Sequence, residues 1–180
     1  MKYVLSIFAF IMPLFPQMIF NFTKDVNIQN WRIVNDGVMG GVSASSFSLG
    51  SNGHGVFQGR ISLENNGGFA SVRYRGLKLQ ANTYSHIKIR LKGDGKTYRF
   101  SVKDNLENRY SYTIPFSTSG DWEEINLSLH QMYPSFRGKK LELPNFSEET
   151  IEEIVFLIGN KKAEEFQLTI ASIQLYSLQD

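Results

Sequence analysis

The sequence predicts an all-β protein, an antiparallel β-sandwich of the jelly-roll type with one short helical turn. Six segments alternate between apolar and polar residues with a period of two, and Gly, Asn, Asp or Pro residues bound them. The chain is also rich in Phe (14) and Tyr (8), which suit sheets better than helices. Its 180 residues show no domain boundary after residue 25, so we expect one domain over residues 21–180.

The alternation predicts strands that are apolar on one face and polar on the other. The six segments are residues 55–64, 70–76, 86–93, 97–103, 110–116 and 123–129. Between neighbouring segments we expect tight hairpins, formed by the turn sequences NNGG and GDG. The glycines assigned to these turns are Gly67, Gly68, Gly93 and Gly95.

Three further elements are expected in the C-terminal part. Residues 147–154 (SEETIEEI) favour a short helix, with Ser147 as its cap and acidic residues in its first turn. The apolar run 154–159 predicts a short strand that is buried on both faces. In residues 165–176 the apolar phase changes parity, which predicts a bulge near Ala171.

Residues 1–20 carry one lysine and then a nearly unbroken apolar stretch, which resembles a secretory signal. Pro13 and Pro16 interrupt what would otherwise be a helix of membrane length. We interpret residues 1–20 as a signal peptide or membrane anchor outside the folded domain, with a buried N-terminal segment as the alternative. The interpretation predicts an exported or membrane-associated protein rather than a cytoplasmic or mitochondrial one.

The formal net charge is only +2, but the charge is unevenly spread. Residues 1–120 carry 14 Lys and Arg against 6 Asp and Glu, whereas residues 121–180 carry 5 against 11. We expect the two parts to pack together and partly neutralise each other, so nucleic-acid binding is not predicted. If their strands are neighbours, seven basic residues on the polar phase would form one cationic face: Arg73, Arg75, Lys88, Arg90, Lys92, Arg99 and Lys103. Such a face leaves an acidic protein or an acidic glycan open as a partner.

The segment WRIVNDGVMGGVSASSF is rich in glycine, which raises the question of phosphate binding. Its spacing matches neither phosphate-loop pattern, and no helix follows whose N-terminus could meet a phosphate. We therefore interpret it as a structural turn. Asn35, Asp36 and Gly37 turn the chain, while Gly40 and Gly41 permit a close backbone approach.

The sequence contains no motif for catalysis, cofactor binding or metal binding. There is no cysteine, and the three histidines are scattered without metal-ligand spacing. We therefore predict a protein that is not an enzyme and holds no cofactor or metal. Asp36 and Glu64 are the one acidic pair that we keep as a candidate site, because both adjoin glycine-rich turns that could meet at one edge of the sandwich. Such a pair could serve glycoside hydrolysis or hold a structural calcium ion.

A binding surface is the remaining interpretation. Trp31 and Trp122 could stack on sugar rings, although we expect Trp31 to pack in the core. The candidate binding residues are Asn35, Asp36, Met39, Glu64, Asn65, Arg73, Arg99 and Trp122.

Four segments occur in the same order in a known family: WRIVNDGVMGGVS, FQGRISLENNGGFASVR, LKGDGKTYRF and IGNKKAEEFQLTIASI. On these residues the chain resembles the complex I intermediate-associated protein 30 family, over roughly residues 26–176. The resemblance implies a galactose-binding-like jelly roll and a chaperone-like, non-enzymatic role in assembling NADH:ubiquinone oxidoreductase. The resemblance implies no catalytic residues in this sequence.

Two functions are therefore predicted. The first is a protein-interaction or assembly factor, with respiratory-complex subunits or another envelope protein as partners and membrane association through residues 1–20. The alternative is a carbohydrate-binding module of the cell envelope, supported by the implied fold, the export-like N-terminus and the available aromatic residues.

Overall fold

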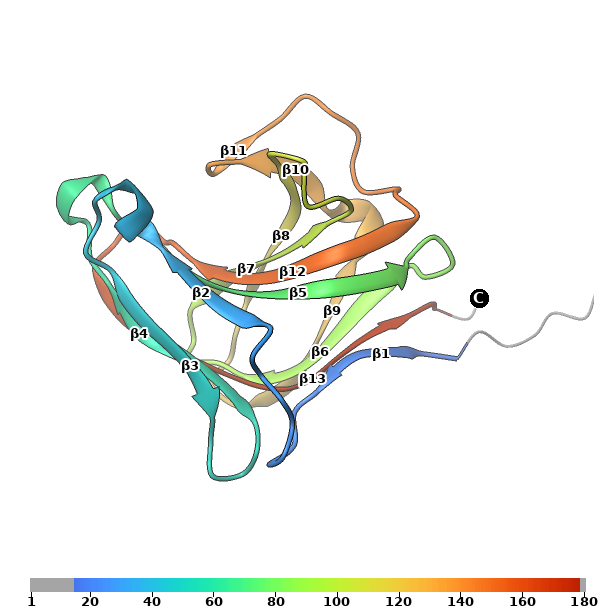
Figure 1. Ribbon diagram of the computed structural model, residues 1–180, viewed down its shortest axis with the longest axis horizontal. Helices are drawn as coiled ribbons and strands as arrows, with labels where there is room; N and C mark the ends of the chain where they lie inside the picture. Colours follow the sequence, from blue (N-terminus) through green and yellow to red (C-terminus); the bar gives the residue numbers. More distant parts are fainter. Residues whose placement is uncertain (1–14, 179–180) are drawn as a thin grey trace, which may run out of the picture.

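The structure, a computed structural model, describes residues 15–178 and consists of two packed antiparallel β-sheets (Figure 1). This confirms the predicted all-β sandwich. Sheet A contains, in spatial order, β3 (Ala44–Leu49), β4 (Gly55–Ile61), β13 (Glu164–Tyr176), β6 (His86–Lys92) and β9 (Trp122–Ser128), and β1 (Gln17–Asn21) also pairs with β13. Sheet B contains β11 (Lys139–Lys140), β10 (Tyr133–Phe136), β8 (Ser111–Ser117), β7 (Thr97–Lys103), β12 (Thr150–Ile158), β5 (Ala70–Gln80) and β2 (Trp31–Asn35). Short 3-10 turns are η1 (Asp36–Met39), η2 (Glu64–Asn66) and η3 (Leu129–Gln131).

β13 is the strand that organises sheet A. Its first half pairs with β4 and its second half with β1, while β6 runs along its other side. The register against β6 shifts between Ile170 and Ser172, which confirms the predicted bulge near Ala171. The bulge restores the inward direction of the apolar side chains after the change of parity.

The core lies between the two sheets and is rich in aromatic side chains. Trp31 is buried and contacts Phe20, Phe47 and Tyr74, with ring centroids between 4.9 and 5.4 Å apart. This confirms that Trp31 is a core residue and not a sugar platform. The alternating segments point their apolar phase inward, as predicted, through buried residues that include Phe57, Ile61, Val72, Ile87, Ile89, Leu91, Tyr98, Phe100, Val102, Tyr112, Phe116 and Leu127.

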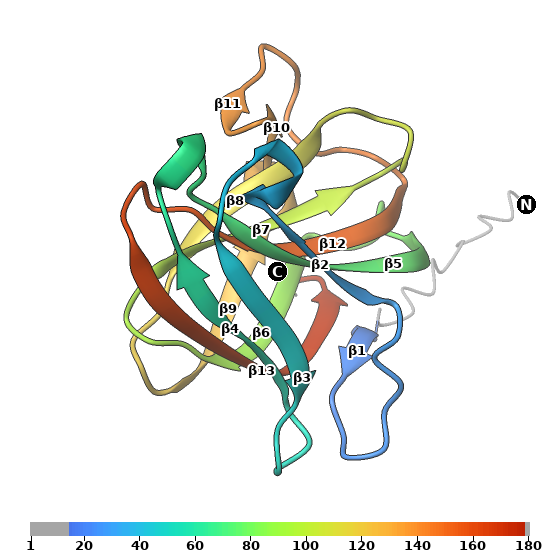
Figure 2. The same ribbon diagram turned by 60° about the vertical axis from the view of Figure 1, so that its left-hand side comes forward.

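The predicted hairpins are wrong, although the strands on either side of them are right. β4 and β5 belong to different sheets, and so do β6 and β7, so residues 65–68 and 93–95 carry the chain from one sheet to the other. Alternation fixes which face of a strand is buried, but two strands that bury facing surfaces need not be neighbours. Figure 2 shows a third crossing, from β2 through η1 to β3, in a segment that the sequence analysis assigned to a turn alone.

The helix predicted at residues 147–154 is wrong as well. Residues 150–158 form β12, which pairs with β5 on one side and β7 on the other. A central strand position offers two ladders of hydrogen bonds, and this tertiary context outweighs the weak local preference of a short acidic segment. Burial of the apolar run on both faces is confirmed, because Ile154 and Phe156 point into the core while Val155, on the opposite face, is also buried.

The fold begins before residue 21. Residues 17–21 form β1, and Ile19 and Phe20 are buried in the core, so the predicted domain boundary at residue 20 is misplaced. The prediction of a signal peptide or anchor otherwise falls on residues 1–14, which lie outside the described residues. Among residues 15–178 there is no helix with the length and apolar character needed to cross a membrane.

Candidate functional site

The buried carboxylate of Asp36 joins the two glycine-rich turns. Asp36 lies at the start of η1 and accepts hydrogen bonds from both the backbone and the hydroxyl of Ser43. It also accepts the backbone N–H groups of Gly68 at 2.6 Å and Phe69 at 3.3 Å, from the turn that precedes β5. Burial alone would raise the pKa of Asp36, but these four hydrogen bonds to the ionised form outweigh it and hold that pKa below its usual value.

The two turns meet at one end of the sandwich, as their sequences suggested. The Asn65 side-chain amide donates to the carbonyl of Gly40 at 3.1 Å, and η1 and η2 lie close together in both views (Figures 1 and 2). Gly41 and Gly67 both face the Asp36 carboxylate: a β-carbon on Gly67 would lie 2.6 Å from its Oδ2 atom. Gly37, in contrast, has open space around it.

This arrangement gives Asp36 a structural position rather than a shared acidic site with Glu64. Asp36 is fully buried and its oxygens are occupied, whereas Glu64 is exposed on η2. Among residues 15–178, no group of three or more His, Cys, Asp or Glu residues is placed to hold a metal ion. At the same end, Met39 is exposed and Asn35 accepts a hydrogen bond from the Ser45 hydroxyl at 2.7 Å.

The seven basic residues do not form one face. Lys88, Arg90 and Lys92 lie on β6 in sheet A, whereas the other four lie on the outer face of sheet B, the face turned away from the core. The condition for a single cationic face is therefore not met, because the strands that carry these residues belong to two sheets. The part of the face on sheet B is nevertheless built from neighbouring strands, in the order β7, β12, β5 and β2.

The cross-strand register defines two rows of residues on this outer face. In one row, Glu153 of β12 lies between Arg75 of β5 and Lys103 of β7. In the next row, Arg73 lies between Val155 and Arg32 of β2, so two arginines are direct neighbours. Farther along the face Arg99 is the register partner of Leu157. The outward residues of these four strands around the cluster include Arg32, Val34, Ser71, Arg73, Arg75, Glu153, Val155, Leu157, Arg99, Ser101 and Lys103.

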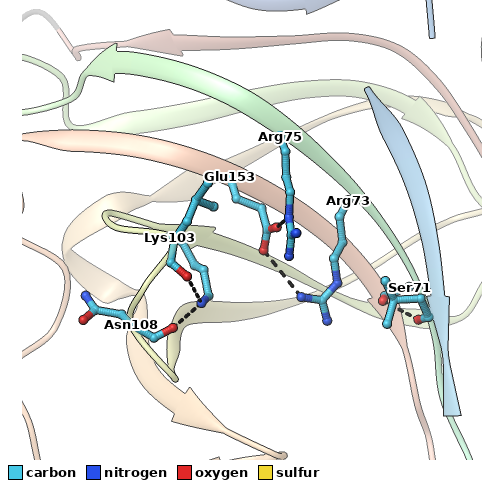
Figure 3. Close-up of polar contacts among 8 residues, drawn as sticks. Ser71, Arg73, Arg75, Lys103, Asn108 and Glu153 are labelled. Carbon is cyan, nitrogen blue, oxygen red and sulfur yellow. Dashed lines mark hydrogen bonds and ion pairs between the residues drawn. The ribbon is translucent and has the colours of Figure 1, made fainter. Parts of the chain in front are cut away.

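Glu153 is the centre of an ion-pair cluster on the outer face (Figure 3). Its side chain is fully buried, with one carboxylate oxygen paired with Nε of Arg75 and the other 3.5 Å from a terminal nitrogen of Arg73. Lys103 donates instead to the carbonyls of Asn108 and Leu106. Three cations thus surround one carboxylate.

The electrostatics of the cluster reflect this excess of positive charge. Burial lowers the pKa of Arg73, and Arg75 lowers it further, while the Glu153 carboxylate partly offsets both effects. Burial likewise lowers the pKa of Lys103, with Glu153 acting against it and the two arginines acting with it. The cationic groups are therefore held close together at a cost in stability, because burial and the neighbouring cations both disfavour their charged forms.

A bulge borders the cluster. The register between β12 and β5 shifts between Ile151 and Glu153, where Gly76 of β5 adopts a positive φ of 87°. Bulges of this kind redirect side chains next to binding sites. Glu153 was not among the predicted site residues, because it fell inside the expected helix. Its shared parity with Val155 and Leu157 in a strand was the signal that could have found it.

Trp122 lies on the other side of the molecule, on the outer face of sheet A. It is 41% exposed, packs against the edge of the His54 ring at 4.9 Å and lies near the guanidinium of Arg90. Two shallow hollows open on the same face, of about 520 and 200 Å³. Side chains that line them include Ser46, Gln58, Arg60, Glu165 and Gln167 for the larger and Lys92, Asp94, Gln167 and Thr169 for the smaller.

The eight candidate binding residues therefore divide among three places. Asn35, Asp36, Met39, Glu64 and Asn65 gather around the joined turns; Arg73 and Arg99 lie on the outer face of sheet B; and Trp122 lies on the outer face of sheet A. Of the three, the second is the place where two arginines pair with a buried carboxylate.

Comparison with protein families identifies the family of this chain. The model of the family described as Complex I intermediate-associated protein 30 (CIA30) matches residues 20–170 of the chain. Comparison with curated proteins gave no match.

Solved structures with a similar fold include carbohydrate-binding modules and an agarase. The family 11 carbohydrate-binding module of a cellulosomal cellulase of Clostridium thermocellum aligns with a TM-score of 0.67 at 13% identity, covering 94% of this chain and 98% of that one. The same organism's module in complex with a β-1,3-1,4-mixed-linked tetrasaccharide gives 0.65 at 14% identity, with coverage of 92% and 97%. An agarase aligns over 91% of this chain and 25% of its own, with a TM-score of 0.60 at 12% identity. At these identities the likeness establishes the fold alone.

Proposed function

Because this chain belongs to the Complex I intermediate-associated protein 30 family, we propose that it is a non-enzymatic binding or assembly factor that holds a protein partner. The observation that carries the proposal is the ion-pair cluster on the outer face of sheet B. Arg73 and Arg75 share one buried carboxylate there, that of Glu153, and Lys103 lies beside it on the neighbouring strand. Positions that reduce stability are typical of functional surfaces.

The cluster suits a protein partner because guanidinium groups bind carboxylates through paired hydrogen bonds. Val34 and Leu157 are half-buried on the same face, so that apolar contact area adjoins the charges. Interfaces commonly combine arginine with such apolar surface. Respiratory-complex subunits are the partners that the family name suggests, and an envelope protein is the alternative if residues 1–20 direct export.

Affinity capture from the protein's own cells tests this proposal. We expect the tagged full-length chain to recover respiratory-complex subunits, and a variant with Arg73→Ala and Arg75→Ala to recover much less. The matched control is Lys24→Ala with Lys162→Ala, which removes two positive charges from exposed loop positions. Recovery of the same proteins by both double variants would contradict a role for the outer face, and recovery of no specific protein by the unaltered chain would contradict the assembly function.

Carbohydrate binding is the second candidate, and a separate observation favours it. Trp122 remains 41% exposed on the outer face of sheet A, beside hollows lined by amide, hydroxyl and charged side chains. An exposed aromatic ring with polar neighbours suits a sugar ring. Isothermal titration calorimetry with a mixed-linked β-glucan tetrasaccharide tests it: binding that disappears in Trp122→Ala but persists in Leu143→Ala, another exposed apolar residue, would support this function.

A further inference from the structure

We propose that the outer face of sheet B binds an extended acidic peptide segment of the partner, with its carboxylates on Arg73 and Arg75. This inference rests on the proposed binding function and names the chemistry of the partner. Charge is the first argument. The outward residues of β2, β5, β12 and β7 include five cations and one carboxylate, and that carboxylate, Glu153, is buried beneath its partners.

The nearby acids restore only part of the balance. The carboxylate of Asp104 accepts hydrogen bonds from the side-chain amide of Asn108, and that of Glu152 accepts the backbone N–H of Leu106 at 3.0 Å. Both contacts order the loop after β7, and both acids stay charged, so three carboxylates, Glu153 included, lie beside the five cations. A ligand that brings carboxylates to the face would supply the missing negative charge.

The guanidinium groups retain donors for such a ligand. Arg73 makes one long contact to Glu153, at 3.5 Å through one terminal nitrogen, which leaves its other terminal nitrogen for a carboxylate, and its side chain is 25% exposed. Arg75 uses Nε for Glu153, which leaves its two terminal nitrogens for a second carboxylate, and its side chain is 51% exposed. Figure 3 shows the two arginine side chains extending from β5 in the same direction, with Glu153 beside them. Glu153 therefore holds the arginines in place and leaves much of their donor capacity unused.

Spacing favours a peptide in the extended conformation. Arg73 and Arg75 are two residues apart on one strand, so their attachment points are separated by about 7 Å. Alternate side chains of an extended peptide have the same repeat, which allows acidic residues at positions i and i+2 to meet one arginine each. Leu157, which is half-buried, lies farther along the same face and offers contact to an apolar residue of the peptide.

The same surface is less suited to a glycan. None of the outward residues of these four strands is aromatic, whereas sugar sites use aromatic faces for stacking. The exposed tryptophan lies on the outer face of sheet A instead. The observations on sheet B therefore favour an acidic peptide over an acidic polysaccharide.

Fluorescence anisotropy with the full-length chain tests the inference. The probe is a labelled ten-residue peptide that alternates glutamate and valine, and its control replaces each glutamate with glutamine. We expect saturable binding of the acidic peptide that weakens at least tenfold in a variant with Arg73→Gln and Arg75→Gln. Binding should stay within twofold of the unaltered chain in the control with Lys24→Gln and Lys162→Gln. Equal binding of the glutamine peptide, or unchanged binding by the double arginine variant, would overturn the inference.

A second variant keeps the test valid if the loss of both arginines unfolds the domain. Glu153→Gln removes the internal competitor for the guanidinium groups and preserves side-chain shape, so we expect the acidic peptide to bind at least threefold more tightly. Circular dichroism reports whether each variant is folded. Unchanged or weaker binding by a folded Glu153→Gln variant would contradict the inference, as would stronger competition by oligogalacturonate or inorganic phosphate than by the unlabelled peptide.

The outcomes separate this inference from the function on which it rests. Arginine-dependent capture of respiratory subunits without peptide binding would reject the acidic-peptide inference alone. Peptide binding without any captured subunit would support the site and reject the assembly function.

Discussion

The carboxylate of Asp36 fills the space in which Gly41 would otherwise carry a side chain. A β-carbon at residue 41 would lie 2.4 Å from Cγ of Asp36 and 2.5 Å from its Oδ1 atom, distances that no non-bonded carbon tolerates. The carboxylate cannot move aside without losing its hydrogen bonds to Ser43, Gly68 and Phe69. The glycine-rich turn is thus shaped by a buried side chain of the same turn and not by a ligand.

Gly41→Ala should therefore destabilise the domain strongly. We expect a loss of about 2–3 kcal/mol in the free energy of unfolding, because overpacking forces the Asp36 network apart. Gly41→Val should leave the domain unfolded. Urea denaturation followed by circular dichroism measures both. The matched control is Gly37→Ala in the same turn, where a β-carbon meets nothing within 4 Å and a change below about 0.5 kcal/mol is expected. If Gly41→Val stays folded and loses partner binding, the turn is a binding site after all.

The lowered pKa of Asp36 predicts acid sensitivity. Because its folded-state pKa lies below its unfolded value, Asp36 stabilises the fold at neutral pH, and this contribution is lost as the pH falls through the folded-state pKa. Asp36→Asn should remove this part of the pH dependence and, since an amide cannot accept all of these hydrogen bonds, cost about 1–3 kcal/mol at pH 7. Unfolding free energies of both proteins between pH 7 and pH 2 check this: the two curves should converge at acid pH. Parallel curves would show that another carboxylate causes the acid transition.

Removal of the Glu153 carboxylate should destabilise the domain more than removal of an exposed surface carboxylate would. Glu153→Ala leaves Arg73, Arg75 and Lys103 without their shared anion at a buried position, and we expect a loss of about 3–5 kcal/mol. Urea denaturation measures it, with Glu165→Ala, at an exposed position on β13, as a control expected to change stability by less than about 0.5 kcal/mol. A loss similar to that of the control would mean that the cluster does not depend on its carboxylate.

The sequence predicted which face of each strand is buried better than it predicted which strands are neighbours. Phe57, Ile89 and Phe100 point into the core because a period of two determines which side of a strand is apolar. The same period carries no information on which strand lies next to which, so the two expected hairpins are crossings between sheets. The charge asymmetry along the chain did predict the pairing of its two parts: Arg73, Arg75 and Lys88 make ion pairs with acids beyond residue 120.

The candidate site was harder to predict for a related reason. Asp36 accepts hydrogen bonds from residues up to 33 positions away in the sequence, and the turn residues 35–37 alone cannot predict these contacts. Glu153 was hidden because a short acidic segment favours a helix locally, whereas its place between β5 and β7 makes it a strand. Both sites depend on contacts between residues that are far apart in the sequence, and a local pattern does not predict such contacts.

Phe20 should be essential to the fold although it lies in the segment that resembles a signal. It is buried on β1, with ring centroids 4.5 Å from Phe22, 4.9 Å from Tyr74 and 5.4 Å from Trp31. Phe20→Ala should lower the free energy of unfolding by about 3–5 kcal/mol, because it removes a ring from the middle of the aromatic cluster. Met18→Ala is the matched control on the same strand; its side chain is 49% exposed, and we expect a change below about 0.5 kcal/mol. Thermal and urea unfolding of the two variants measure the difference. Equal stabilities would mean that β1 does not dock on β13, and would place the start of the domain after residue 20.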